Sequence, residues 1–306
     1  MALFGGSALL LGRPAHAQLE ITVAPSTDQL VELIEGFGVE VLNVTVFCDD
    51  MSYGSFTGES DLQMAEGLVL ATGDAGCAAN PALTFCATST VYPGDPDVAL
   101  LAGVTTFDAC AIEFDCIPLG DTLLLNYSFG SEEYPNYTCS TVNDAFGLFL
   151  SGPGIQGPFS NGAVNIATVP GTDIPISINT VNAGSPSWPG DSVTCTAADP
   201  NWQANSVYFI DNVDGQTVAY DGMTVNLTAM AVVQSGETYH FKIAVADGGD
   251  AILDSGVFLE AFSYRSTGVS TGVTAAAPGA LGIHHDGERT WLALPPTAQG
   301  SVQVFS

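Results

Sequence analysis

Acidic and amide side chains concentrate in two loop-like segments of the sequence, residues 129–144 and 247–254. Each segment follows an apolar run and contains glycines that allow the chain to bend. Calcium is bound by about six to eight oxygen atoms from carboxylates, amides and backbone carbonyls on loops. The sequence therefore predicts a calcium site with these ligands: Glu132, Glu133, Asn143, Asp144, Asp247, Asp250 and Asp254.

A shorter acidic turn contains Asp95 and Asp97 on either side of Pro96. We interpret it as a second calcium candidate with fewer ligands. Residues 247–254 lack the spacing and the final glutamate of an EF-hand, so a calcium site here belongs to another type. For both loops the alternative is an ordinary solvated turn.

The same carboxylates could act on a glycan, because glycoside hydrolysis needs only two carboxyl groups. Glu132 and Glu133 are adjacent and point to opposite sides of an extended segment, so either one would need a different partner, such as Asp144 or Asp247. Four aromatic residues in loop-like stretches could stack on sugar rings. These residues, which could instead cover the edge of a core, are Tyr134, Tyr137, Trp188 and Trp202.

Other catalytic machinery is missing from the sequence. His240 is the one histidine of the predicted main domain, and it lies inside a strand-like pattern. We interpret it as a packed or surface imidazole rather than a catalytic base. The sequence contains no G-x-S-x-G elbow, H-E-x-x-H helix or P-loop, so it predicts a protein that is not an enzyme.

The charge balance is strongly acidic, with 33 acidic residues, 4 lysines and arginines, and a formal net charge of -29. Such a field repels nucleic acid and anionic membranes and attracts divalent cations. A saline habitat is a competing explanation for the same charge.

The first residues predict export. Residues 2–12 form an apolar run that is too short to span a bilayer. Ala15-His16-Ala17 fits a signal cleavage site, which gives a signal peptide over residues 1–17 and a mature start near Gln18. No later run is long and apolar enough for a transmembrane helix.

Seven cysteines indicate an oxidising compartment. Cys110 and Cys116 share a strand-like run that places them ~20 Å apart, too far for a direct bond, so each needs another partner. The odd count leaves one thiol free, which we assign to Cys48. No C-x-x-C motif supports a zinc site. The predicted disulfides are Cys77 with Cys86 and Cys139 with Cys195.

A scaffold of β-strands must position these residues. Ser26 and Gln29 can form a capping box before a helical pattern that Gly36 ends. The runs that follow are rich in β-branched and aromatic residues and are separated by turn residues. Such a series predicts an all-β fold, a jelly-roll-like antiparallel β-sandwich with one short N-terminal helix. The predicted strands are residues 39–47, 111–117, 122–127, 146–150, 238–245 and 256–262.

Four blocks of sequence, in order, resemble the choice-of-anchor L domain of bacterial surface proteins. They are residues 67–75, 106–115, 129–154 and 237–261. The resemblance spans about residues 26–265 and implies a module of the cell envelope. It implies no shared activity, because the family is named for its varied anchors.

Four regions follow along the chain: the signal peptide 1–17, a choice-of-anchor L-like β-sandwich domain over 18–265, a linker over 266–280 and a β segment over 281–306. The linker is rich in serine, threonine, glycine and alanine. The last segment resembles the first half of a type IX secretion sorting domain, and a plain C-terminal hairpin is the alternative.

These observations predict an exported surface module for adhesion or extracellular structure, stabilised by calcium and secreted or held on the outer surface of a bacterium. The predicted partners are components of the cell envelope or the extracellular matrix, including glycans, and not nucleic acid. One alternative is a secreted protein that binds or cleaves glycans with paired carboxylates. Another is a fibre subunit that self-associates through unpaired sheet edges.

Overall fold

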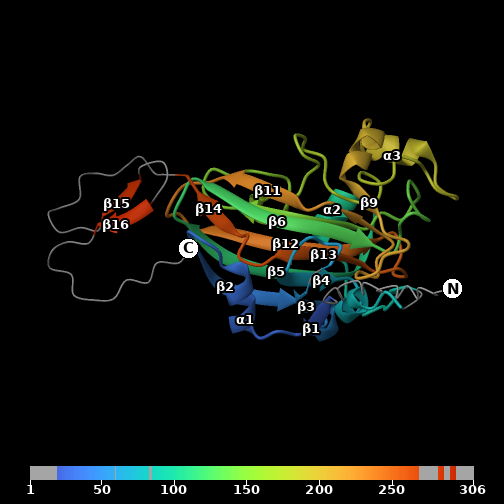
Figure 1. Cartoon of the computed structure of the whole chain (residues 1–306). Coiled ribbons are helices and arrows are strands. Elements are labelled where there is room, and N and C mark those ends of the chain that lie inside the picture. Colours follow the sequence, from blue (N-terminus) through green and yellow to red (C-terminus); the bar gives the residue numbers. More distant parts are fainter. Residues whose placement is uncertain (1–18, 59, 83–84, 269–281, 286–289, 294–306) are drawn as a thin grey trace, which may run out of the picture. The chain divides into compact units, whose positions relative to one another are not determined.

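The computed structural model describes residues 19–268 except 59 and 83–84, together with residues 282–285 and 290–293 (Figure 1). The chain divides into two units, Met1–Gly268 and Val269–Ser306. In the second unit, β15 (Gly282–His285) pairs antiparallel with β16 (Thr290–Ala293). The predicted signal peptide, most of the predicted linker and the rest of the last segment lie outside the described residues.

The described part of the first unit is a β-sandwich of two antiparallel sheets, which confirms the predicted fold class (Figure 1). The larger sheet has nine strands. Its main path is β1 (Glu20–Val23), β3 (Tyr53–Thr57), β4 (Glu66–Ala71), β13 (Ser255–Glu260), β6 (Thr122–Ser131), β10 (Gly222–Thr224) and β9 (Phe209–Asp211), while β11 (Leu227–Val232) and β14 (Arg265–Thr267) also pair with β6.

The smaller sheet has five strands, in the order β2 (Val39–Phe47), β5 (Thr106–Pro118), β12 (Tyr239–Gly248), β7 (Ala145–Ser151) and β8 (Val164–Asn165). Alternation along its strands separates two faces. On β5, Ile112 and Phe114 point into the core between the sheets, whereas Ala111 and Glu113 point to the outer face. The predicted strands all fall within observed strands apart from residues at their ends.

Helix α1 (Thr27–Ile34) has the predicted capping box between Ser26 and Gln29, and it buries Leu30 and Ile34 in the core. The structure adds α2 (Pro96–Ala102) and α3 (Ser192–Ala198), which the sequence did not predict. Each has seven residues, too few to show a clear helical period. Short 3₁₀ turns occupy Asp50–Ser52, Ala75–Ala79, Ser160–Gly162 and Trp202–Tyr208.

Helix α2 lies over part of the outer face of the smaller sheet. Its Val98 and Ala102 pack on a layer of small residues from β5 and β12, including Ala109 and Ala244. The helix begins at Asp95, whose Oδ1 accepts from the backbone N–H of residues 97 and 98. This arrangement covers one end of the outer face and leaves the rest open.

Candidate functional site

Four strand ends bring the predicted acidic residues together at one end of the sandwich. Antiparallel pairing places the end of β6 beside the start of β13, since Ser131 is opposite Ser255. The end of β12 likewise lies beside the start of β7. The two sheets join here, because Asp144 accepts from Ser255 Oγ at 2.6 Å and from Gly248 N at 2.8 Å. Residues distant in sequence therefore share one site.

We call this site the acidic cluster. Its members are carboxylates with exposed fractions of only 2–3%: Asp108, Glu132, Glu133, Asp144, Asp247 and Asp254. Five of the six come from the predicted calcium ligands, so the two acidic segments do converge. Asp108 was not predicted, because it lies inside a strand-like run and not in a turn.

Backbone and hydroxyl groups hold several of these carboxylates in place. Asp254 accepts from Thr88 N at 2.9 and 3.1 Å, and Glu132 Oε1 accepts from Cys86 N at 3.0 Å. Gly73 packs against the Asp254 carboxylate so closely that a Cβ at this position would collide with it. The shape of the cluster thus requires a glycine at position 73.

Three buried carboxylate oxygens of the cluster have no hydrogen-bond partner. They are Asp108 Oδ2, Glu133 Oε2 and Asp247 Oδ1. Buried polar atoms are nearly always paired, so each such oxygen indicates a missing partner. The ion pairs in the described residues involve none of the cluster carboxylates.

Burial sets the protonation of the cluster when no cation is present. It raises the pKa of Glu132 to about 8 and that of Asp254 to about 7, with a smaller contribution from neighbouring carboxylates. Burial and then the charge of Asp144 raise the pKa values of Glu133 and Asp247 in the same way. Without a cation, the cluster therefore holds protons near neutral pH.

The cluster has the chemistry of an oxygen-only metal site but not a complete ligand shell. Among the described residues, no three histidine, cysteine, aspartate or glutamate side chains stand in a metal-binding arrangement. A bound ion would need the unpaired oxygens to turn toward it and backbone carbonyls to complete its shell.

Two of the predicted ligands near the cluster have other positions. Asp250 is half-buried, and its charge acts on Glu133 and Asp144 from the side of the cluster. The amide of Asn143 is used on both sides, since Nδ2 donates to Ala102 O and Oδ1 accepts from Asn179 N. Both polar atoms of the Asn143 amide are thus engaged within the protein, and its role as a calcium ligand stays a prediction.

A lysine occupies the second calcium candidate, the turn with Asp95 and Asp97. Lys242 Nζ lies 2.6 Å from Asp95 Oδ2 and 2.9 Å from Asp97 Oδ2. Asp97 Oδ1 accepts further bonds from the N–H and hydroxyl of Ser160. The ammonium group pairs with both carboxylates at the place where a cation would bind.

The predicted aromatic platform does not form as one surface. Tyr134 is fully buried and donates to Val181 O at 2.6 Å, and Trp202 is buried against the Cys139–Cys195 disulfide. Neither ring can stack on a ligand, so this part of the prediction is wrong. Tyr137 and Trp188 are exposed, at 40% and 92%.

The three disulfides include both predicted pairs, Cys77–Cys86 and Cys139–Cys195. The assignment of the free thiol to Cys48 is wrong, because Cys48 is bonded to Cys110. β2 and β5 pair with Phe47 opposite Ala111, which brings Cys48, the residue directly after β2, beside Cys110. The free cysteine is Cys116, which is buried beneath the hydroxyl of Tyr264.

Protein taken from its native compartment should contain these three disulfides and one unreactive thiol. Burial raises the pKa of Cys116 to about 11, so alkylation should be undetectable in the folded protein and reach one equivalent in denaturant. Non-reducing peptide mapping after cleavage at acidic residues would identify the pairs. Reactive Cys48 and Cys110 thiols in the isolated protein would contradict this assignment and the predicted export.

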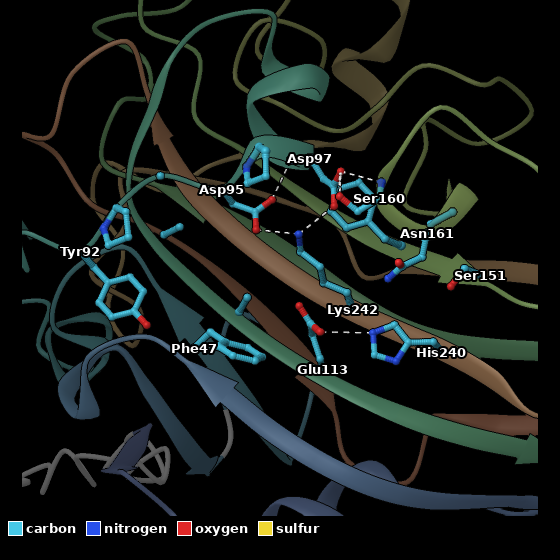
Figure 2. Close-up of a pocket in the computed structure, with 17 residues that line it drawn as sticks. Phe47, Tyr92, Asp95, Asp97, Glu113, Ser151, Ser160, Asn161, His240 and Lys242 are labelled. Atoms are coloured by element: carbon cyan, nitrogen blue, oxygen red, sulfur yellow. Dashed lines mark hydrogen bonds and ion pairs between the residues drawn. The ribbon is translucent and has the colours of Figure 1, made fainter.

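A second feature, which the sequence did not predict, is a pocket on the outer face of the smaller sheet (Figure 2). We call it the outer-face pocket. It has a volume of about 370 Å³. Its lining includes Phe47, Tyr92, Glu113, Asn161, His240 and Lys242.

His240 lies in this pocket between two carboxylates. Its Nδ1 is 3.0 Å from Asp115 Oδ1, and its Nε2 is 3.2 Å from Glu113 Oε2. Ser151, His240 and Asp115 are cross-strand neighbours on β7, β12 and β5. This row has the residue types of a catalytic triad, but both ring nitrogens face carboxylates, so the imidazole is not poised to activate the Ser151 hydroxyl.

Within the described residues, no helix is long and apolar enough to cross a membrane. The family model described as the choice-of-anchor L domain matches residues 20–265. No curated protein and no solved structure matches the chain.

Proposed function

Because the chain belongs to the choice-of-anchor L domain family, whose members are surface-associated modules of bacteria, we propose that it is a non-catalytic surface or secreted module. We propose further that calcium bound in the acidic cluster stabilises this module. Its role is adhesion or extracellular structure. The observation that carries the proposal is a set of six buried carboxylates, three of which have an unpaired oxygen.

Charge repulsion argues for a cation in the cluster. An isolated buried carboxylate costs several kcal/mol relative to water unless it is paired or protonated. Two carboxylates about 4 Å apart repel by about 4 kcal/mol where the effective dielectric constant is about 20. A dication reverses the sign of this interaction for every carboxylate around it.

The donor atoms favour calcium over transition metals. The cluster offers carboxylate and backbone oxygens and no imidazole or thiolate from its own members, which suits hard cations. Calcium accepts irregular shells of about six to eight oxygens, whereas magnesium requires near-octahedral geometry and retains water. A dry site assembled from several loops therefore suits calcium better.

Burial also argues against glycan cleavage by these carboxylates. A general acid must reach the glycosidic oxygen of its substrate. Glu132 and Glu133 are 3% and 2% exposed, so a polysaccharide cannot contact them in this arrangement. The acidic cluster is better suited to stabilising the fold than to chemistry on a sugar.

Calcium binding should depend on the unpaired oxygens. We expect Glu133→Gln and Asp247→Asn each to weaken calcium affinity by at least about tenfold, since each removes a charge and an unpaired oxygen from the site. Isothermal titration calorimetry on protein treated with chelator and shown to be metal-free by elemental analysis measures the effect.

Asp214→Asn is the matched control, because it removes the same charge from an exposed turn outside the cluster. Its affinity should stay within about twofold of the parent protein. If calcium affinity falls by the same factor in all three variants, calcium binding depends only on net charge. If the parent protein takes up no calcium, the stabilising role is wrong.

A further inference from the structure

The outer-face pocket is separate from the acidic cluster. It opens on the side of the smaller sheet that faces away from the core, and its floor is made by residues of β5, β7 and β12. Small residues at Ala109 and Ala111 keep the floor deep. Its volume of about 370 Å³ lies at the lower end of the range for small-ligand sites.

Aromatic rings lie toward one side of this pocket. Figure 2 shows the side chains of Phe47, on β2, and Tyr92, in the loop before α2, on the same side. Phe47 is 44% exposed although it is a large apolar side chain. An exposed ring beside a hollow gives a flat apolar surface on which a ligand can stack.

Polar groups lie toward the other side and along the floor. Figure 2 places Ser160 and Asn161 opposite the aromatic rings, with Glu113 and His240 at the floor. The side chains of His240 and Glu113 are 34% and 31% exposed, so a ligand can reach them. The contact between His240 Nε2 and Glu113 Oε2 holds both side chains in place. The pocket therefore combines a carboxylate and an imidazole, which are held together, with the amide of Asn161.

Lys242 does not make the pocket an anion site. Its ammonium is held by Asp95 and Asp97 and lies 5.3 Å from the centre of the Phe149 ring. The two carboxylates exceed its charge, and Glu113 adds a third negative charge to the lining. Phosphates, sulfates and acidic sugars are repelled by this balance.

We propose that the outer-face pocket binds an uncharged sugar residue of a polysaccharide. One face of a pyranose ring is apolar and stacks on aromatic side chains such as Phe47, while its hydroxyls bond to carboxylates, imidazoles and amides. The inference deepens the proposed adhesive role and rests on it for its biological use. The pocket itself is independent of the acidic cluster.

Purified full-length protein, with calcium present, is tested for binding to a panel of uncharged, amino and acidic oligosaccharides by glycan array and then by calorimetry on the best binders. Uncharged sugars should bind, and acidic sugars should not. Phe47→Ser should weaken binding by at least about tenfold and Glu113→Gln by at least about fivefold. Phe37→Ser is the matched control, because Phe37 is 84% exposed and lies outside the pocket, and its affinity should stay within about twofold.

Several outcomes overturn the proposal. One is an array with no bound sugar; another is tighter binding of simple amines than of any uncharged sugar. A third is binding that survives Phe47→Ser but is lost in Trp188→Ala, which would place the site at the exposed ring predicted from the sequence. Calcium titration of the same variants separates the two proposals, since Phe47→Ser should retain the calcium affinity of the parent protein. A melting curve is recorded for each variant first, so that an unfolded variant is not mistaken for one that has lost the binding site.

Discussion

Chelation of calcium at pH 8 should lower the melting temperature of the protein by about 5–10 °C, and the same treatment at pH 5 should have little effect. If calcium binds only the folded form, a hundredfold excess over its dissociation constant contributes about 2.7 kcal/mol to stability. For a domain of this size, each kcal/mol changes the melting temperature by about 2–4 °C.

The pH dependence follows from the protonation of the acidic cluster. In the cation-free protein, the pKa of Glu132 is raised from 4.5 to about 8 and that of Asp254 from 3.8 to about 7, chiefly by burial. Groups with raised pKa values contribute stability that is fully present below pH ~4 and is lost as the pH rises through about 7 to 8. Calcium requires the ionised carboxylates, so its stabilising effect is largest where the cation-free protein is weakest.

Differential scanning calorimetry across pH 5–8, with chelator and then with added calcium, measures this dependence. Sodium chloride at matched ionic strength is the control, because it screens charges without occupying a site. Equal rescue by sodium chloride would favour the saline-habitat explanation of the net charge. A chelator effect that is larger at pH 5 than at pH 8 would contradict the role of the acidic cluster.

Replacing Lys242 with methionine should cost about 3–5 kcal/mol in the free energy of unfolding. Lys242, Asp95 and Asp97 have side-chain exposures of only 11%, 13% and 6%. Removing one partner of a buried ion pair leaves uncompensated charge, and this costs more than the intact pair contributes. Urea unfolding followed by fluorescence measures the change.

A triple variant tests whether unpaired charge is the cause. Lys242→Met combined with Asp95→Asn and Asp97→Asn leaves no buried charge at this place and should recover most of the lost stability. Arg265→Met, which removes a half-buried cation that forms no ion pair with another described residue, should change the free energy of unfolding by less than about 1 kcal/mol. If Lys242→Met lowers the free energy of unfolding by less than about 1 kcal/mol, water reaches the ion pairs of Lys242 with Asp95 and Asp97.

Local sequence patterns predicted the structural features that depend on residues close together in the sequence. The capping box of Ser26 and Gln29 places α1 within one residue of its observed start. Alternation predicted β2 with its observed bounds, because apolar and polar residues alternate along most of the run. The Cys77–Cys86 pair closes a short loop and was visible for the same reason.

Features that depend on strand order could not be predicted from one sequence. The partner of Cys48 is fixed by the register of β2 against β5. The ion pair of Asp97 with Lys242 joins residues 145 positions apart, so both aspartates looked like solvated turn residues. The outer-face pocket draws its lining from four strands, the start of α2 and two loops, and it has no contiguous signature.

The burial of two aromatic rings could not be predicted for a related reason. Tyr134 and Trp202 lie in stretches without strand periodicity, which favours exposed loops. In the structure, Tyr134, in the connection between β6 and β7, packs on Phe209 of β9, and Trp202 packs on the Cys139–Cys195 disulfide. Irregular backbone here contributes to the core and not only to the surface.

Lys242 is the only lysine in the chain, and it lies within β12 with its side chain almost fully buried. Proteases of the trypsin type cut after lysine and arginine in segments that can unfold locally to enter their active sites. Between residues 19 and 268, the other basic residue of this kind is Arg265, which lies in the last strand of the domain. The folded domain therefore offers such proteases almost nothing to cut in its interior. Resistance to digestion by such proteases is thus built into the composition of this surface-associated module.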